Sequence, residues 1–241
     1  MALVSLSTLR TLARERADMV GSTFIADSAT GIDRWINEGA QKLHQILVET
    51  YSSDYMETTA TVTPSAAGLA ALPSDFFKLL GVEMTVGGQA YTLHRYNRQE
   101  RNAFGVVSPR RSLPLYKLTG PSSSTYYRQI EFKPPALAYG QTLTVRYAPV
   151  FSARNQMGVI TNAVLTATTD TVDFDNGWER YIVLYTAIQM LKKEESDTGP
   201  LEMELAECFK QIVAGAENRD ADQAPQAVDA DAVDWDPLRY I

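Results

Sequence analysis

The sequence is poor in the residues that bind metals and form covalent cross-links. Its 241 residues include one cysteine, Cys208, and two histidines, His44 and His94. A single thiol cannot form an intramolecular disulfide, and two distant histidines do not have the close spacing of a zinc site. We therefore expect a chain that holds no metal and no cofactor and that fits a reducing compartment.

Long apolar runs and catalytic motifs are also missing. No segment approaches 18 apolar residues, and residues 1–12 do not have the order of a signal peptide, so we expect a soluble, cytoplasmic chain with no membrane contact. The sequence contains no GxGxxG, GxSxG, HExxH or phosphate-loop pattern. The clustered carboxylates Glu194, Glu195 and Asp197 are interpreted as a solvated turn between two helices. We therefore expect that the protein is not an enzyme.

The net charge of -7 is distributed unevenly along the chain. Residues 78–154 carry 11 basic and 3 acidic side chains, whereas residues 220–241 carry 1 basic and 6 acidic side chains. The overall acidity argues against a protein that grips nucleic acid over its whole surface. For the basic segment three interpretations stay open: a solvated surface, docking on an acidic neighbour, and contact with DNA. Its candidate interface residues are arginines interleaved with tyrosines, namely Arg95, Arg98, Arg101, Arg110, Arg111 and Arg128.

Helical periodicity is found near both ends of the chain. Apolar residues recur at three- and four-residue intervals in 7–19, 31–51, 178–191 and 201–213. Thr30 is the predicted cap of the second of these helices. The predicted buried face of the last helix consists of Leu201, Leu205, Phe209, Ile212 and Val213.

Residues 56–150 have the alternating pattern and the turn residues of β-structure. Two β-rich runs, 77–86 and 89–95, flank Gly87-Gly88, and both glycines can adopt the positive φ of a tight hairpin turn. Residues 64–72 are predicted as a loop of small residues, and 97–104 as one turn of helix. Further strands are predicted near 59–63, 115–118, 125–132 and 141–147.

These patterns predict an α+β fold with a helical bundle, a mainly antiparallel β insertion and an extended C-terminal arm. The predicted divisions are 1–55 and 175–219 for the bundle, 56–150 for the insertion, 151–174 for a connecting loop and 220–241 for the arm.

The predicted arm combines the composition of a disordered segment with an apolar end. It contains six aspartates, Pro225 and several alanines. A purely solvated tail has no need of an apolar cluster, so we expect the arm to dock on a partner, with aromatic anchors in pockets and aspartates facing a basic surface. The apolar cluster consists of Trp235, Pro237, Leu238, Tyr240 and Ile241.

Three stretches, taken in order, resemble bacteriophage head-to-tail adaptor (connector) proteins. The first is DRWINEG at 33–39, within a predicted helix. The second is LPSDFFKLLGV at 72–82, which leads into the Gly-Gly hairpin. The third is NGWERYIV at 176–183, followed by KKEESD at 192–197. With the end of the last helix, the resemblance spans about residues 5 to 220 and rests on the order and spacing of these stretches.

The resemblance implies a structural protein of the virion at the head–tail junction, assembled in the host cytoplasm. Such adaptors form a ring, usually of twelve copies, beneath the portal protein. The ring contacts tail or nozzle proteins and surrounds a channel through which genomic DNA passes without sequence-specific binding. Carried over, residues 220–241 become a portal-binding arm with the apolar cluster as candidate anchors. The alternative is a nucleic-acid-binding module that uses residues 78–154 and is autoinhibited by its acidic tail.

Overall fold

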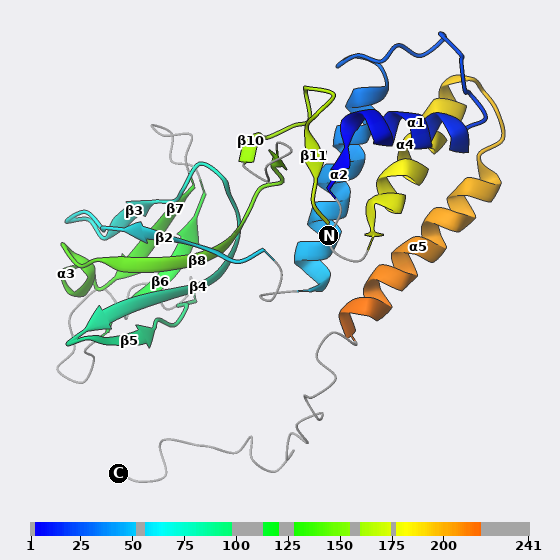
Figure 1. Cartoon of the computed structure of the whole chain (residues 1–241). Helices are drawn as coiled ribbons and strands as arrows, with labels where there is room; N and C mark the ends of the chain where they lie inside the picture. Colours follow the sequence, from blue (N-terminus) through cyan, green and yellow to red (C-terminus); the bar gives the residue numbers. More distant parts are fainter. Residues whose placement is uncertain are drawn as a thin grey trace, which may run out of the picture.

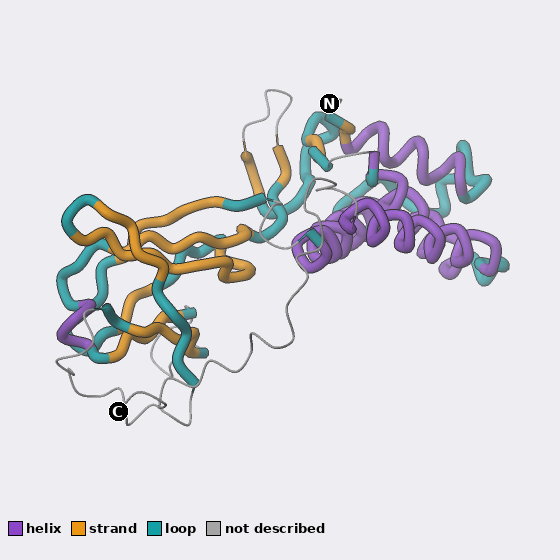
Figure 2. Tube along the Cα trace, turned by 90° about the horizontal axis from the view of Figure 1, so that it is seen from below, coloured by secondary structure: helices purple, strands orange, loops and turns teal. Residues whose placement is uncertain are grey.

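A helical lobe and a β lobe make up the part of the chain that the computed structural model describes. That part comprises residues 3–51, 56–97, 113–120, 128–154, 160–174 and 177–217. The long helices gather at one end of the molecule and strands β2 to β8 at the other (Figures 1 and 2). The sheets are antiparallel, so the predicted α+β class is confirmed.

Helices α1, α2, α4 and α5 form the helical lobe. α1 begins after Ser5, whose side chain accepts a hydrogen bond from the backbone N–H of Thr8. α5 begins beside Asp197, whose carboxylate accepts the N–H of Gly199 at 2.9 Å. One carboxylate of the predicted solvated turn therefore also caps a helix. The bounds are Leu6–Arg16 for α1, Ile32–Thr50 for α2, Glu179–Lys193 for α4 and Gly199–Glu217 for α5.

Two details of these helices correct the prediction. No side chain caps α2, which begins after Gly31, so Thr30 is not its cap. Phe209 is 44% exposed, although it was predicted on the buried face of α5. With 100° between successive helical residues, Cys208 and Ile212 lie at the centre of the buried stripe and Phe209 falls to its side.

The β lobe contains two antiparallel sheets, with strand orders β2-β8-β4-β5 and β3-β7-β6. The predicted hairpin is confirmed: Val86 pairs with Gln89, and the two glycines between them have φ of 58° and 85°. The predicted loop at 64–72 contains strand β3, because this edge strand is formed by pairing with the distant β7. The bounds are Thr58–Val62 (β2), Leu69–Ala71 (β3), Phe76–Val86 (β4), Gln89–Thr92 (β5), Leu115–Thr119 (β6), Gln129–Lys133 (β7) and Leu143–Pro149 (β8), with the short helix α3 at Pro135–Ala138.

A small third sheet, of order β1-β11-β9-β10, lies beside the helices. Val4 pairs with Val172 and Ser5 with Thr171, so the start of the chain is joined to the segment that precedes α4. Most of this sheet lies in 151–174, which was predicted as a connecting loop; strands of two or three residues are too short to carry a periodic signal. The bounds are Val4–Ser5 (β1), Ala153–Arg154 (β9), Ile160–Asn162 (β10) and Thr171–Val172 (β11).

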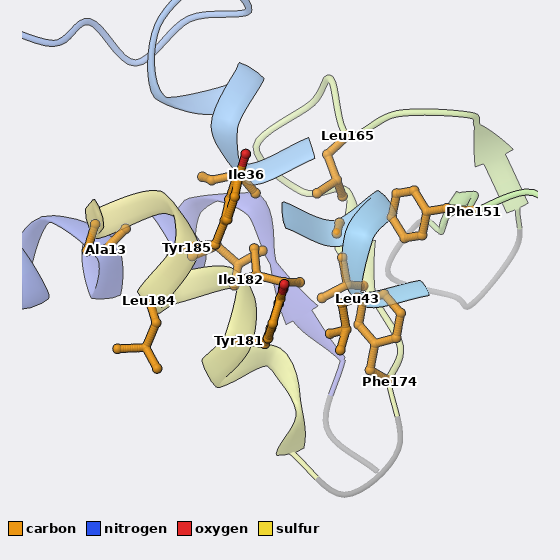
Figure 3. Packing of buried hydrophobic residues seen from close by; sticks show 14 of the residues in the cluster. Ala13, Ile36, Leu43, Phe151, Leu165, Phe174, Tyr181, Ile182, Leu184 and Tyr185 are labelled. Atoms are coloured by element: carbon orange, nitrogen blue, oxygen red, sulfur yellow. The ribbon is translucent and has the colours of Figure 1, made fainter. Parts of the chain in front are cut away.

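Each lobe has its own cluster of buried apolar side chains. In the helical lobe, Ile36 and Leu43 of α2 pack toward Ile182 of α4 (Figure 3). Phe151 and Phe174, from the segment that returns from the β lobe, stack with ring centroids 5.9 Å apart and join this cluster. The β-lobe cluster is centred on Ile130, Phe132, Leu143 and Val145.

The two lobes meet along the second half of α2. The Nε2 of His44 lies 2.9 Å from the carbonyl oxygen of Pro149, and the Nζ of Lys78 donates to the carbonyl of Val48 at 3.1 Å. The His44 ring also lies edge-on to Phe151, with centroids 6.1 Å apart. The predicted boundaries of bundle and insertion fall near this junction and stay predictions.

Candidate functional site

The structure describes part of the predicted interaction surface. Arg95 and Arg128 belong to described residues, and the other predicted positions do not. Outside the described residues lie the arm at 220–241 with Trp235, Pro237, Leu238, Tyr240 and Ile241, the arginines Arg98, Arg101, Arg110 and Arg111, and nearly all of the predicted helical turn at 97–104.

Arg95 and Arg128 line the same groove of the β lobe, which has a volume of about 420 Å³. They lie far apart in the sequence, yet strands β4, β6 and β7 bring them to one place. Apolar and aromatic side chains, half-buried or buried, form much of the rest of its lining. We call this the arginine groove; its other lining side chains include Phe76, Leu79, Tyr116 and Leu118.

Both arginines extend from backbone that is held in place. Arg95 forms a bridge with Tyr116 of β6, and the flanking backbone hydrogen bonds of Tyr116, to His94 and Tyr96, are 3.0 Å long. Arg128 directly precedes β7. Its Nη1 donates to the carbonyl of Phe77 at 3.3 Å, and its guanidinium carbon lies 5.9 Å from the Phe76 ring centroid. The two exposed cationic groups are therefore positioned by strands and not by a loose loop.

These two arginines differ from the others that the structure describes. Every other described arginine has a carboxylate within 4 Å. Within the same ranges, Arg95 and Arg128 form no ion pair. Because surface guanidinium groups are usually balanced by a nearby acid in this chain, the arginine groove is a local concentration of unbalanced positive charge.

The helical lobe contributes a second groove, between α1 and α4, of about 670 Å³. Its floor is apolar, and its rim includes Arg16 of α1 and Arg180 of α4, which both bind Glu204 of α5. The hydrogen bonds from Arg180 and Arg16 lower the pKa of Glu204, so this carboxylate stays ionised and joins three helices. The floor residues are Val4, Leu12, Val183 and Leu184.

The outer surface of α5 carries exposed apolar side chains. Met203 is 77% exposed and Phe209 is 44% exposed. Large exposed apolar groups on a folded helix are typical of a surface that another protein covers. Together with the groove between α1 and α4, they make the helical lobe a candidate protein–protein interface.

A third hollow, of about 460 Å³, lies at the lobe junction and is lined by His44, Asp75, Phe151 and Arg154, among others. His44 is 3% exposed, and burial lowers its pKa. Since the Pro149 carbonyl can only accept, the ring carries its proton on Nε2, and Nδ1 has no hydrogen-bond partner among the described residues. Asp75 accepts a hydrogen bond from the Tyr147 hydroxyl at 3.0 Å; burial, followed by this bond, raises the pKa of Tyr147 to about 12.

Residues of the DRWINEG stretch connect helix α2 to neighbouring parts of the fold. Both side-chain nitrogens of Arg10 that face Asp33 donate to its carboxylate. The side-chain amide of Asn37 donates to the Leu165 carbonyl at 3.0 Å and accepts the Leu165 N–H at 2.7 Å, as a backbone partner would. Gly39 faces α4 so closely that a β-carbon there would lie 3.1 Å from the Tyr185 ring. The sequence indicated a helix here and gave no sign of these partners.

Two searches of the described residues are negative. They contain no group of three or more metal-ligating side chains placed to hold an ion. Nor does any helix within the described ranges combine the length and apolarity needed to cross a membrane.

Comparison with known proteins adds one match. A family model described as SU10 adaptor protein matches residues 4–229, which include every described helix and strand. No curated protein matches the chain.

Proposed function

The chain belongs to the SU10 adaptor protein family, and from this we propose that it forms a ring that joins the portal to the tail of a phage and continues the DNA channel. Membership makes it a phage adaptor, a structural protein of the virion's head–tail junction, and confirms the resemblance seen in the sequence. The observation that carries the proposal is the extent of the match, since it covers both lobes and not a single motif. The ring of twelve copies, the portal contact and assembly in the host cytoplasm are parts of the proposal.

The helical lobe supplies the contacts between neighbouring copies. Met203 and Phe209 on one copy would enter the apolar groove between α1 and α4 of the next. Contact between two different surfaces of identical chains generates a ring when the rotation closes. The groove rim carries charges of both signs, which would fix the register of the two chains.

Residues 220–241 would attach the ring to the portal. They begin three residues after the end of α5 and combine acidic side chains with an apolar end. In this arrangement Trp235, Leu238, Tyr240 and Ile241 fill pockets of the portal, and Pro237 limits the conformations of the segment before binding. The β lobe, at the other end of the molecule in Figure 1, would face tail or nozzle proteins. DNA would pass through the ring without sequence-specific contacts.

Co-expression with the portal protein of the same phage tests this proposal. We expect the full chain to purify with the portal and to appear as a closed ring by electron microscopy. Deleting residues 220–241 should abolish co-purification and leave the circular dichroism spectrum of the folded lobes in place. Met203→Ser with Phe209→Ser should reduce ring formation, whereas Gln45→Ser with Lys210→Ser, two exposed polar positions, should not. Normal co-purification of the truncated chain would overturn the role of the arm.

A further inference from the structure

The arginine groove has charge that nothing in the described part of its own chain balances. Arg95 and Arg128 both line it, and neither forms an ion pair with a described carboxylate. The third cationic side chain of the lining is Lys78, whose ammonium group already donates a hydrogen bond to the Val48 carbonyl. A ligand that satisfies the groove must therefore bring negative charge.

The shape of the groove indicates more than a simple anion. The same groove is lined by Tyr116, Leu118 and Leu79, all half-buried, and by the buried ring of Phe76. An apolar or aromatic side chain can cover this surface while carboxylates on either side meet the arginines. A short peptide in which an aromatic residue is flanked by acidic residues fits both features.

The chain itself contains such a segment. Residues 229–240 place Asp229, Asp231, Asp234 and Asp236 close to Trp235 and Tyr240. These aspartates supply the missing negative charge, and Trp235 supplies a ring next to two of them.

We propose that, before the portal is bound, the acidic C-terminal segment of each molecule docks in the arginine groove of the same molecule. The portal then competes with this groove for the segment. This goes beyond portal attachment, because it concerns the isolated chain. It also accounts for an apolar C-terminal sequence and an unbalanced cationic groove in one chain.

The length of the segment permits intramolecular docking. The 11 residues between the end of α5 and Asp229 (218–228) can span roughly 36 Å when extended. A compact chain of this size has a radius of gyration of roughly 18 Å, so the segment can reach the β lobe. A short tether of this length produces an effective concentration in the millimolar range, so even a contact with a dissociation constant of about 100 µM is mostly closed.

The test places a fluorophore on the segment of the full chain, without portal. Cys208 is buried and is the single thiol, so Cys208→Ser with Ala232→Cys gives one labelling site within the acidic run. Time-resolved anisotropy at nanomolar protein should show the dye tumbling with the whole molecule at low salt. Raising the salt should release it, because the contact depends on exposed charges.

Charge reversal in the groove provides the decisive comparison. Arg95→Glu with Arg128→Glu should free the dye and lower the amplitude of its slow motion several-fold. The control, Arg34→Glu with Lys210→Glu, changes the net charge equally at exposed positions of the helical lobe and should leave the dye docked. Circular dichroism identifies any variant that does not fold, and the milder pair Arg95→Gln with Arg128→Gln should then show the same release.

Three results would overturn the proposal. One is equal dye mobility in the wild-type and groove variants. Another is a slow component that grows with protein concentration, which would assign the groove to a second molecule. The third is duplex DNA binding that the groove variants abolish while the dye in the DNA-free chain stays unchanged, which would make the groove a nucleic-acid site. Loss of portal binding in a separate assay would leave all three readouts unaffected, so this proposal and the proposed function can fail independently.

Discussion

Arg10 of α1 and Asp33 of α2 form a two-pronged ion pair at the start of the helical lobe. The Nε and Nη2 atoms of Arg10 donate to the two carboxylate oxygens of Asp33, each at 2.7 Å. Asp33 is 4% exposed, and its hydrogen bonds with Arg10 raise the pKa of the Arg10 guanidinium, which therefore stays charged beside the buried carboxyl group. The pair fixes α1 against the first turn of α2, which is the stretch that carries the family resemblance.

Replacing Asp33 by alanine is expected to lower the free energy of unfolding by about 3 kcal/mol, because it leaves the guanidinium of Arg10 partly buried without its partner. Urea denaturation followed by circular dichroism measures the change. The control is Glu38→Ala, which removes the exposed i,i+4 partner of Arg34 and should cost only about 0.5 kcal/mol. Equal losses for the two variants would show that the Arg10–Asp33 pair has no special role.

Gly39 is expected to tolerate no branched side chain. A valine there places its β-carbon 3.1 Å from the Tyr185 ring and 3.4 Å from Ile182, so α2 and α4 must separate. The expected loss of stability is about 2 kcal/mol, measured by thermal or urea unfolding. Ala206→Val, at an exposed position of α5, introduces the same side chain into a helix and should cost about 0.5 kcal/mol or less. A stable Gly39→Val variant would contradict the close packing of the two helices.

His44 is expected to make the lobe junction sensitive to acid. Burial lowers its pKa below the ordinary value of 6.5, so the unfolded chain takes up a proton more readily than the folded chain. The stability that depends on neutral His44 is therefore complete above pH 6.5 and falls as the pH drops from there toward the lowered pKa.

The comparison is His44→Gln, which keeps a donor for the Pro149 carbonyl and cannot be protonated. Urea unfolding at about pH 7.5 and about pH 5.5 should show a steeper decline for the wild-type chain than for the variant. Carboxylates elsewhere contribute equally to both proteins. Parallel declines would mean that His44 does not titrate differently in the folded and unfolded states.

We expect binding to the portal to depend more on the aromatic side chains of the arm than on its aspartates. Trp235→Ala with Tyr240→Ala should weaken binding of the full chain to portal by a hundredfold or so, because aromatic anchors dominate such interfaces. Asp229→Asn with Asp231→Asn should weaken it by less than tenfold at physiological salt. Binding is measured by biolayer interferometry on immobilised portal. Equal effects of the two pairs would indicate an arm held by electrostatics alone.

Local patterns predicted the parts of the fold that depend on neighbouring residues. The Gly87-Gly88 hairpin and the four long helices follow from turn chemistry and from the 3.6-residue period, and the structure confirms them. Strand β3 and the third sheet did not follow, because their short strands exist only through pairing with distant partners. Phe209 was wrongly predicted to be buried, because the helical period indicates which face of α5 is buried but not how wide the buried stripe is.

The arginine groove could be predicted only in part. Composition and charge singled out Arg95 and Arg128 among six arginines, but nothing in the sequence said that these two share a wall. That required the bridge of Arg95 to Tyr116 and the position of Arg128 just before β7. The other described arginines differ from these two because they form ion pairs. Most of those ion pairs also join residues far apart in the sequence, such as Arg146 with Glu57 and Glu83.

The chain crosses from the helical lobe to the β lobe after α2 and crosses back after β8. These two crossings lie side by side. The contact of His44 with Pro149 and that of Lys78 with Val48 both occur at this point. Strand β1 pairs with β11 without involving the β lobe. Everything between the crossings can thus lengthen, shorten or be exchanged during evolution while the helices keep their mutual geometry. Under the proposed function, this arrangement separates the lobe that would face the tail from the lobe that would pack between neighbouring copies.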